Sequence, residues 1–174
     1  MKIKNYKDTP ICSFLFVLII VVFSLYFTNA IKNVPCEKDM KSIFISNFIH
    51  TDFVHLVSNL YGIYALSRVE HKVGFKKFFT LVIFLLIFNT IFEIVLHRII
   101  NTPCSIGFSG ILYGIATFEI VCNETIDYNM IGAILVNISV SKIFDKKSSL
   151  SGHIIGGVSG ILGAIIFKKF RNCF

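Results

Sequence analysis

A serine set between glycines and a histidine followed by further glycines are the residues of this chain best suited to covalent chemistry. The serine, Ser109, lies in the string GFSG at residues 107–110, and the histidine is His153. A serine hydroxyl becomes a nucleophile when a neighbouring base takes its proton, and the imidazole of histidine titrates close to neutral pH. Ser109 and His153 are therefore the candidate nucleophile and base of an acyl-transfer site.

Both strings also carry the GxxxG spacing with which membrane helices pack closely, from Gly110 to Gly114 and from Gly156 to Gly160. A packing face is the alternative interpretation of each string taken alone. If the two helices pack through these glycines, their backbones come near enough for the hydroxyl and the imidazole to hydrogen-bond. This requires both side chains to enter from the same face of the membrane.

A third polar group consists of His50, His55 and Asn59. In a helix the nine steps from first to last span roughly 13 Å, and the last two share one side because they are four residues apart. Two neutral donors on one helix face suit the oxyanion of a tetrahedral intermediate. Contact with water and headgroups at a helix end, or a metal bound by the two histidines, are the alternatives that spacing leaves open. The five scattered cysteines lack the close pairing of a zinc site, so none is predicted.

Apolar segments must position these residues. The 174-residue chain is 55% hydrophobic and only 16% charged, which is more apolar surface than one soluble core of that size could bury. Without water, backbone groups are satisfied only in helices or closed barrels, and the runs lack the alternation of barrel strands. The sequence predicts an all-α membrane protein, one domain over residues 1–174, with six transmembrane helices at about 11–31, 53–69, 78–96, 109–122, 128–144 and 150–167.

The lysines and arginines set the expected orientation. Ten of them fall on the side of the N-terminus and seven on the other side, which favours cytoplasmic N- and C-termini. Ser109, His153 and the His50–Asn59 group then share the outer side. The fifth segment is short, since fourteen uncharged residues separate Asp127 from Lys142. Because the basic residues stand beside helix ends and form no stripe with stacking aromatics, no nucleic-acid partner is expected.

Together these strings resemble the rhomboid family of intramembrane serine proteases, and a pattern from Glu70 to Gly74 adds to the resemblance, which covers about residues 50–160. The resemblance implies a Ser109–His153 dyad without a third, acidic member, with Tyr113 stacking on the histidine. It further implies support from His50, space for the substrate at Gly107, and an oxyanion hole made by His55, Asn59 and the Ser109 backbone N–H.

The same resemblance implies single-pass transmembrane proteins as substrates, the lipid bilayer as surroundings and no cofactor. The chain departs from the family in having no tryptophan, so the Trp-Arg motif of the first outer loop is missing, and that loop is short. Two alternatives stay open. One is a catalytically silent relative that escorts membrane clients, and the other is a small transporter lined by histidines.

Two cysteines and two glutamates are the remaining residues with chemistry of their own. Cys36 and Cys104 would both lie on the outer side, which allows a disulfide between them. Glu93 and Glu119 lie towards helix ends and are interpreted as interfacial or packing groups without a catalytic role.

Overall fold

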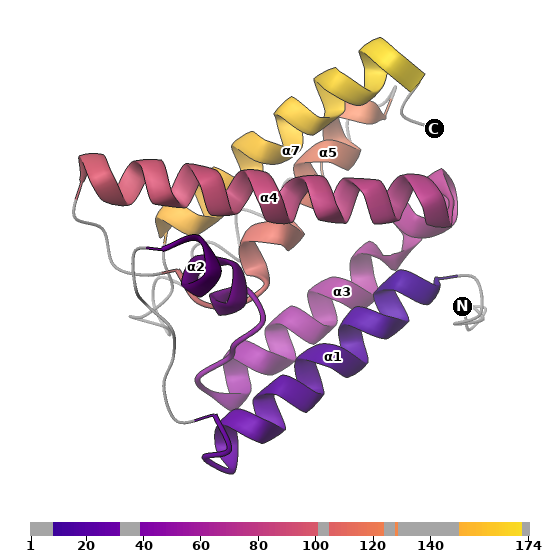
Figure 1. The fold of residues 1–174 in the computed structure, drawn as a ribbon. Coiled ribbons are helices and arrows are strands. Elements are labelled where there is room, and N and C mark those ends of the chain that lie inside the picture. Colours follow the sequence, from indigo (N-terminus) through magenta and orange to yellow (C-terminus); the bar gives the residue numbers. More distant parts are fainter. Residues whose placement is uncertain (1–8, 32–38, 101–104, 124–127, 129–149, 172–174) are drawn as a thin grey trace.

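The chain folds into helices throughout the part that the structure describes (Figure 1). This computed structural model describes residues 9–31, 39–100, 105–123, 128 and 150–171. Its helices are α1 (Pro10–Phe27), α2 (Met40–Ser46), α3 (Phe53–Val73), α4 (Phe75–Ile99), α5 (Ser109–Cys122) and α7 (Leu150–Arg171). The predicted segment 128–144, apart from Tyr128, and both Cys36 and Cys104 lie outside the described residues.

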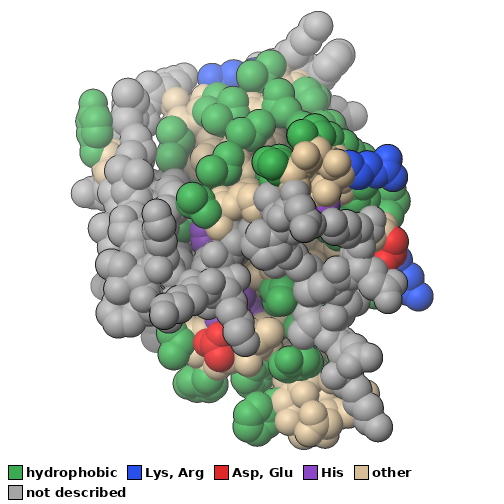
Figure 2. Space-filling model, turned by 90° about the vertical axis from the view of Figure 1, so that its left-hand side faces the viewer, with side chains coloured by type: hydrophobic (Ala, Val, Ile, Leu, Met, Phe, Trp, Pro, Cys, Tyr) green, Lys and Arg blue, Asp and Glu red, His purple; other side chains and the backbone are tan. Residues whose placement is uncertain are grey.

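Several helices suit a lipid environment. By length and composition, Pro10–Phe27, Phe75–Ile99 and Leu150–Lys168 are able to cross a membrane, and α5 is a shorter apolar helix. The exposed face of α4 repeats every four residues with large apolar side chains, at Ile83, Ile87, Ile91 and Val95. Figure 2 shows hydrophobic side chains gathered in the upper middle of one face of the molecule, with others near its lower end. These apolar surfaces indicate a membrane protein.

The helix ends differ from the expected ones. The first helix ends at Phe27, not near residue 31, because Asn29 adopts a left-handed conformation with φ of 58°. The second predicted helix is α3, which continues past residue 69 to Val73. The third is α4, which begins at Phe75, so that Gly74 alone joins the two helices. Its φ of 81° is one that glycine adopts without strain. Lys72 lies beyond the predicted end of the second helix, and in the structure it is part of α3 and pairs with Glu119.

A short helix that the sequence did not predict, α2, precedes the His50 region. The side chain of Asp39 caps its start by accepting hydrogen bonds from the backbone N–H groups of Lys41 and Ser42, at 2.9 and 3.0 Å. The helix lies beside α4 in Figure 1, and its last residue, Ser46, is buried. This short helix supplies one wall for the segment that leads into α5.

The closest helix pairing joins α5 to α7. A Cβ atom built on Gly156 or on Gly160 would overlap the backbone carbonyl oxygen of Gly110 or Gly114, respectively. The hydroxyl of Thr117 also donates a hydrogen bond across the pair, to the Gly157 carbonyl at 2.9 Å. Backbones approach this closely only where side chains are absent, so the glycine spacing in both helices sets the pairing.

Two buried carboxylates fasten α3 to its neighbours. Glu70 accepts hydrogen bonds from the backbone N–H groups of Ile11 and Cys12, each at 2.8 Å, and so satisfies two donors at the start of α1. Glu119 of α5 pairs with Arg68 at 3.3 Å and with Lys72 at 3.1 Å. Partners of this kind offset the cost of burying charge.

Replacing Gly156 by alanine should destabilise the bundle by about 3 kcal/mol, because the new methyl group meets backbone that cannot rotate away. Gly157→Ala is the matched control, since its Cβ would meet only the Thr117 methyl at 3.6 Å. Alanine there should be neutral or slightly stabilising through its helix propensity. Unfolding of the purified variants in detergent measures both, and equal stabilities of the two variants would contradict the packing described.

Glu70→Ala should lower the free energy of unfolding by about 2–3 kcal/mol, because it leaves two buried backbone donors at the start of α1 without an acceptor. Asp39→Ala removes a cap from an exposed helix start, where water replaces it, and should cost about 1 kcal/mol or less. Denaturant titration compares them, and an Asp39 variant as unstable as the Glu70 variant would speak against the buried cap.

Candidate active site

Ser109 and His153 meet at the pairing of α5 and α7. Ser109 is the first residue of α5, and His153 lies in the first turn of α7. The serine Oγ is 3.0 Å from the histidine Nε2, and the histidine is only 6% exposed. The ring of Tyr113, one turn along α5, lies over the imidazole with centroids 4.4 Å apart. For the hydroxyl to donate to Nε2, the imidazole must carry its proton on Nδ1.

The backbone before α5 is held in an unusual conformation. Gly107 has φ of 98°, and its N–H donates to the Ser46 carbonyl of α2 at 2.9 Å. The Phe108 ring packs against Phe48 with centroids 5.7 Å apart, and the Phe108 N–H points at the His50 Nε2 over a long 3.5 Å. Contacts to α2 and to the segment after it thus fix the direction in which Ser109 enters its helix.

The predicted third polar group gathers beside this backbone. A Cβ on Gly107 would lie 2.5 Å from two ring atoms of His55, so only glycine leaves room there. The rings of His50 and His55 meet edge to face, with centroids 4.9 Å apart. Asn59 lies one turn further along α3, where its amide nitrogen donates to the His55 carbonyl at 2.8 Å. Its amide oxygen is buried and has no partner within the described part of the chain.

His50 is held neutral. It is fully buried, and this burial, followed by the proximity of His55, lowers its pKa to about 4. A neutral ring lets Nε2 face the Phe108 N–H as an acceptor. Within the described residues, no three His, Cys, Asp or Glu side chains form a metal-binding cluster.

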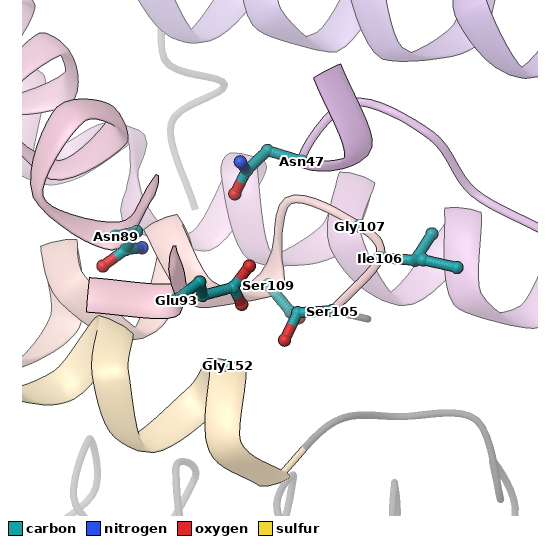
Figure 3. A pocket seen from close by; sticks show the side chains of 9 residues that line it. Asn47, Asn89, Glu93, Ser105, Ile106, Gly107, Ser109 and Gly152 are labelled. Carbon is teal, nitrogen blue, oxygen red and sulfur yellow. The ribbon is translucent and has the colours of Figure 1, made fainter. Parts of the chain in front are cut away.

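A small polar pocket lies beside Ser109, which is one of the residues that line it (Figure 3). Four polar residues outside the predicted site contribute to its walls. They are Asn47 at the end of α2, Asn89 and Glu93 of α4, and Ser105 in the segment before α5. The cavity measures about 10 Å³, on the scale of a single water molecule. Asn89 and Glu93 are four residues apart and both buried, so polar residues at helical spacing in an apolar helix were the signal that could have found them.

Helices that suit a bilayer and a partly buried serine–histidine contact define this chain as an α-helical membrane protein with a polar site inside its bundle. The chain also matches the model of one protein family, the rhomboid domain, over residues 37–170. This match covers more than half of the sequence, and the chain belongs to the rhomboid family.

Two curated relatives support this membership. A protein of Acanthamoeba polyphaga mimivirus named "Putative rhomboid protein L523" is 25% identical to this chain over 156 residues. These residues cover 88% of this chain and 87% of the relative. The mitochondrial rhomboid-like protein 14 of Arabidopsis thaliana is 25% identical over 158 residues, covering 79% of this chain and 45% of that protein. Neither description specifies proteolysis, so the activity of this chain must be argued from its site.

Protonation of His50 should make the fold sensitive to acid. Because its pKa is lower in the folded chain than the ordinary 6.5, stability is complete above about pH 6.5 and falls as the pH drops towards 4. Between pH 7 and pH 5 this one group should cost roughly 2 kcal/mol. Unfolding measured at both pH values, for wild type and His50→Gln, checks this. The variant should lose less stability on acidification, and an equal loss would contradict the assignment.

Proposed function

We propose that this chain is an intramembrane serine protease that cleaves transmembrane segments of other membrane proteins. The observation that carries the proposal is the 3.0 Å contact between Ser109 Oγ and His153 Nε2, partly buried where two glycine-lined helices meet. The pair has the geometry that a nucleophile and its general base require. Membership of the rhomboid family, which includes serine proteases, supports the same activity.

In the proposed reaction Ser109 Oγ attacks the carbonyl carbon of the scissile peptide bond while its proton passes to His153 Nε2. The resulting tetrahedral intermediate carries an oxyanion, for which His55, Asn59 and the Ser109 backbone N–H are the proposed donors. His153 then gives its proton to the leaving amine as the peptide C–N bond breaks. A water molecule attacks the acyl-enzyme, passing its proton to His153, which returns it to Ser109 Oγ as the ester bond breaks.

The neighbouring residues have proposed supporting roles. Tyr113 orients the imidazole through the ring contact at 4.4 Å. Gly107 leaves space beside the nucleophile for the substrate backbone, and the neutral His50 fixes the loop from which Ser109 projects. The Asn59 amide carries two N–H donors, so one can stay on the His55 carbonyl while the other is the proposed donor to the oxyanion.

The proposed arrangement in the membrane has six spanning helices, with segment 128–144 as the fifth and both termini in the cytoplasm. The dyad would then open to the outer side. Single-pass proteins whose helix unwinds easily are the proposed substrates, since a helical peptide bond is shielded until the backbone becomes extended. The missing Trp-Arg motif and short first loop mean that this chain would dock its substrates differently from relatives that carry them.

A catalytically silent rhomboid that escorts membrane clients is the second candidate. It is favoured by relatives at 25% identity whose descriptions name no protease activity. Such a protein would have no need for a serine hydroxyl placed on an imidazole nitrogen, and the contact between these two atoms therefore favours the protease.

The test is cleavage of a panel of single-pass reporter proteins by the purified chain in liposomes. Ser109→Ala should abolish cleavage, because no other nucleophile is proposed, and His153→Ala should reduce it at least about a hundredfold through loss of the general base. Cleavage is followed by gel and the cut site by mass spectrometry.

Two matched variants control for nonspecific effects. Ser159→Ala removes a buried serine hydroxyl of α7 away from the dyad, and His71→Ala removes an exposed histidine from the end of α3. Both should retain cleavage. A folded wild type that cleaves no reporter, or a Ser109→Ala variant that still cleaves, would contradict the proposed protease function. The escort function would then be the favoured candidate.

A further inference from the structure

Glu93 is a buried carboxyl group whose position relative to the dyad calls for a function. It lies on α4, is only 7% exposed and lines the same pocket as Ser109. Figure 3 shows its carboxyl group reaching from α4 towards Ser109 and Ser105. Among the described residues that line this pocket, Glu93 is the single carboxylic acid, and none is a lysine or an arginine. A carboxyl group is costly to bury in such a bundle, so its presence there invites a functional explanation.

The carboxyl group lies against the backbone that carries His153. A Cβ built on Gly152, the residue before it, would be 3.3 Å from Glu93 Oε1 and 2.7 Å from Ser105 Oγ. The Ser105 hydroxyl hydrogen-bonds to Glu93 and so fixes its direction. The glycine at 152 is therefore what allows the acid to approach the first turn of α7, one residue before His153.

The surroundings determine which charges the acid can act on. Ionisable side chains near the dyad are His50 and His55 beside Gly107, Tyr113 on α5 and His153 on α7, and His97 lies one turn beyond Glu93 on α4. Asn47, at the end of α2, is neutral. Of these groups, His153 is the one that becomes a cation during the proposed reaction. A nearby carboxylate in a poorly solvated site favours that cation.

We propose that Glu93 is an acidic positioning residue of the dyad, which stabilises the protonated imidazole of His153 from the wall of the pocket while Ser105 holds the carboxyl group in place. This inference rests on the proposed protease function. The acid would act through space from a different helix and contact neither substrate nor the reacting atoms. It supplies an acidic contribution that a Ser–His dyad otherwise lacks.

A purely structural explanation makes a different prediction. A carboxylate near the start of α7 also suits the positive end of that helix and would stabilise the fold without affecting proton transfer. Removing its charge would then lower activity by the same factor at every pH. An electrostatic effect on His153 instead changes the shape of the pH profile, because the imidazole would accept a proton less readily.

The test compares wild type with Glu93→Gln, which keeps the shape and the hydrogen bond to Ser105 but removes the charge. The rate at which a fluorophosphonate probe labels Ser109 is measured from pH 5 to pH 9, together with kcat/KM for a cleaved reporter. In the variant both rates should fall about tenfold at high pH. The acid limb should move about one pH unit lower, so that the curves of wild type and variant converge in acid.

Two further variants sharpen the result. Glu93→Asp retains the charge and should keep the acid limb where wild type has it. Glu119→Gln removes a different buried carboxylate, the one paired with Arg68 and Lys72, and should leave the limb in place whatever it does to stability.

The outcomes separate this inference from the protease function itself. Labelling of wild type with parallel or superimposed profiles for Glu93→Gln overturns the role of Glu93 alone. A limb that moves equally in Glu119→Gln also overturns it, since the shift would then follow any loss of buried charge. A folded wild type that the probe does not label overturns the proposed function, and this inference with it.

Discussion

The close approach of α5 and α7 is the constraint on which the site depends. Carbonyl oxygens of Gly110 and Gly114 occupy the space that side chains at residues 156 and 160 would take. Since Ser109 stands at the start of one helix and His153 in the first turn of the other, this approach alone brings a hydroxyl within 3.0 Å of an imidazole. The GxxxG spacing and the chemistry were rival interpretations of the same strings, but in the structure the packing creates the contact.

Two buried carboxylates elsewhere in the bundle have partners that make their burial tolerable. Glu70 completes the start of α1, and Glu119 holds two cations of α3. Around the dyad the balance differs, because the buried side-chain atoms His50 Nδ1, Asn59 Oδ1 and Asn89 Oδ1 have no hydrogen-bond partner within the described residues. Buried groups left without partners mark places where a fold gives up stability, and one of them, Asn89, lines the pocket beside Ser109.

Much of the helical frame could be predicted from apolar run length, and the start of α5 at Ser109 and of α7 at Leu150 match the expected ranges. Run length placed the end of the second helix at residue 69, whereas α3 continues to Val73 with Arg68 and Lys72 paired to a residue 47 or more positions away. It also missed α2, which is seven residues long and has no apolar run of spanning length. Both failures concern contacts that only the tertiary structure defines.

Some residues of the site could be predicted from the sequence, and others could not. Ser109, His153 and Tyr113 were singled out by local strings, and the structure brings their side chains together. Glu93 was interpreted as an interfacial or packing group because it lies towards a helix end, and nothing local links it to Gly152, 59 residues further along the chain. Spacing along one helix can be predicted from sequence, whereas the face that a second helix presents to it depends on the packing of the whole bundle.

The most direct measurement is to react the folded protein in liposomes with a fluorophosphonate and locate the adduct by peptide mass spectrometry, in wild type and in His153→Ala. If the packing of α5 on α7 activates the serine, the adduct forms at Ser109 in the wild type and is lost in the variant. An unmodified Ser109 in the folded wild type, or equal modification without His153, would show that the 3.0 Å contact does not make a nucleophile.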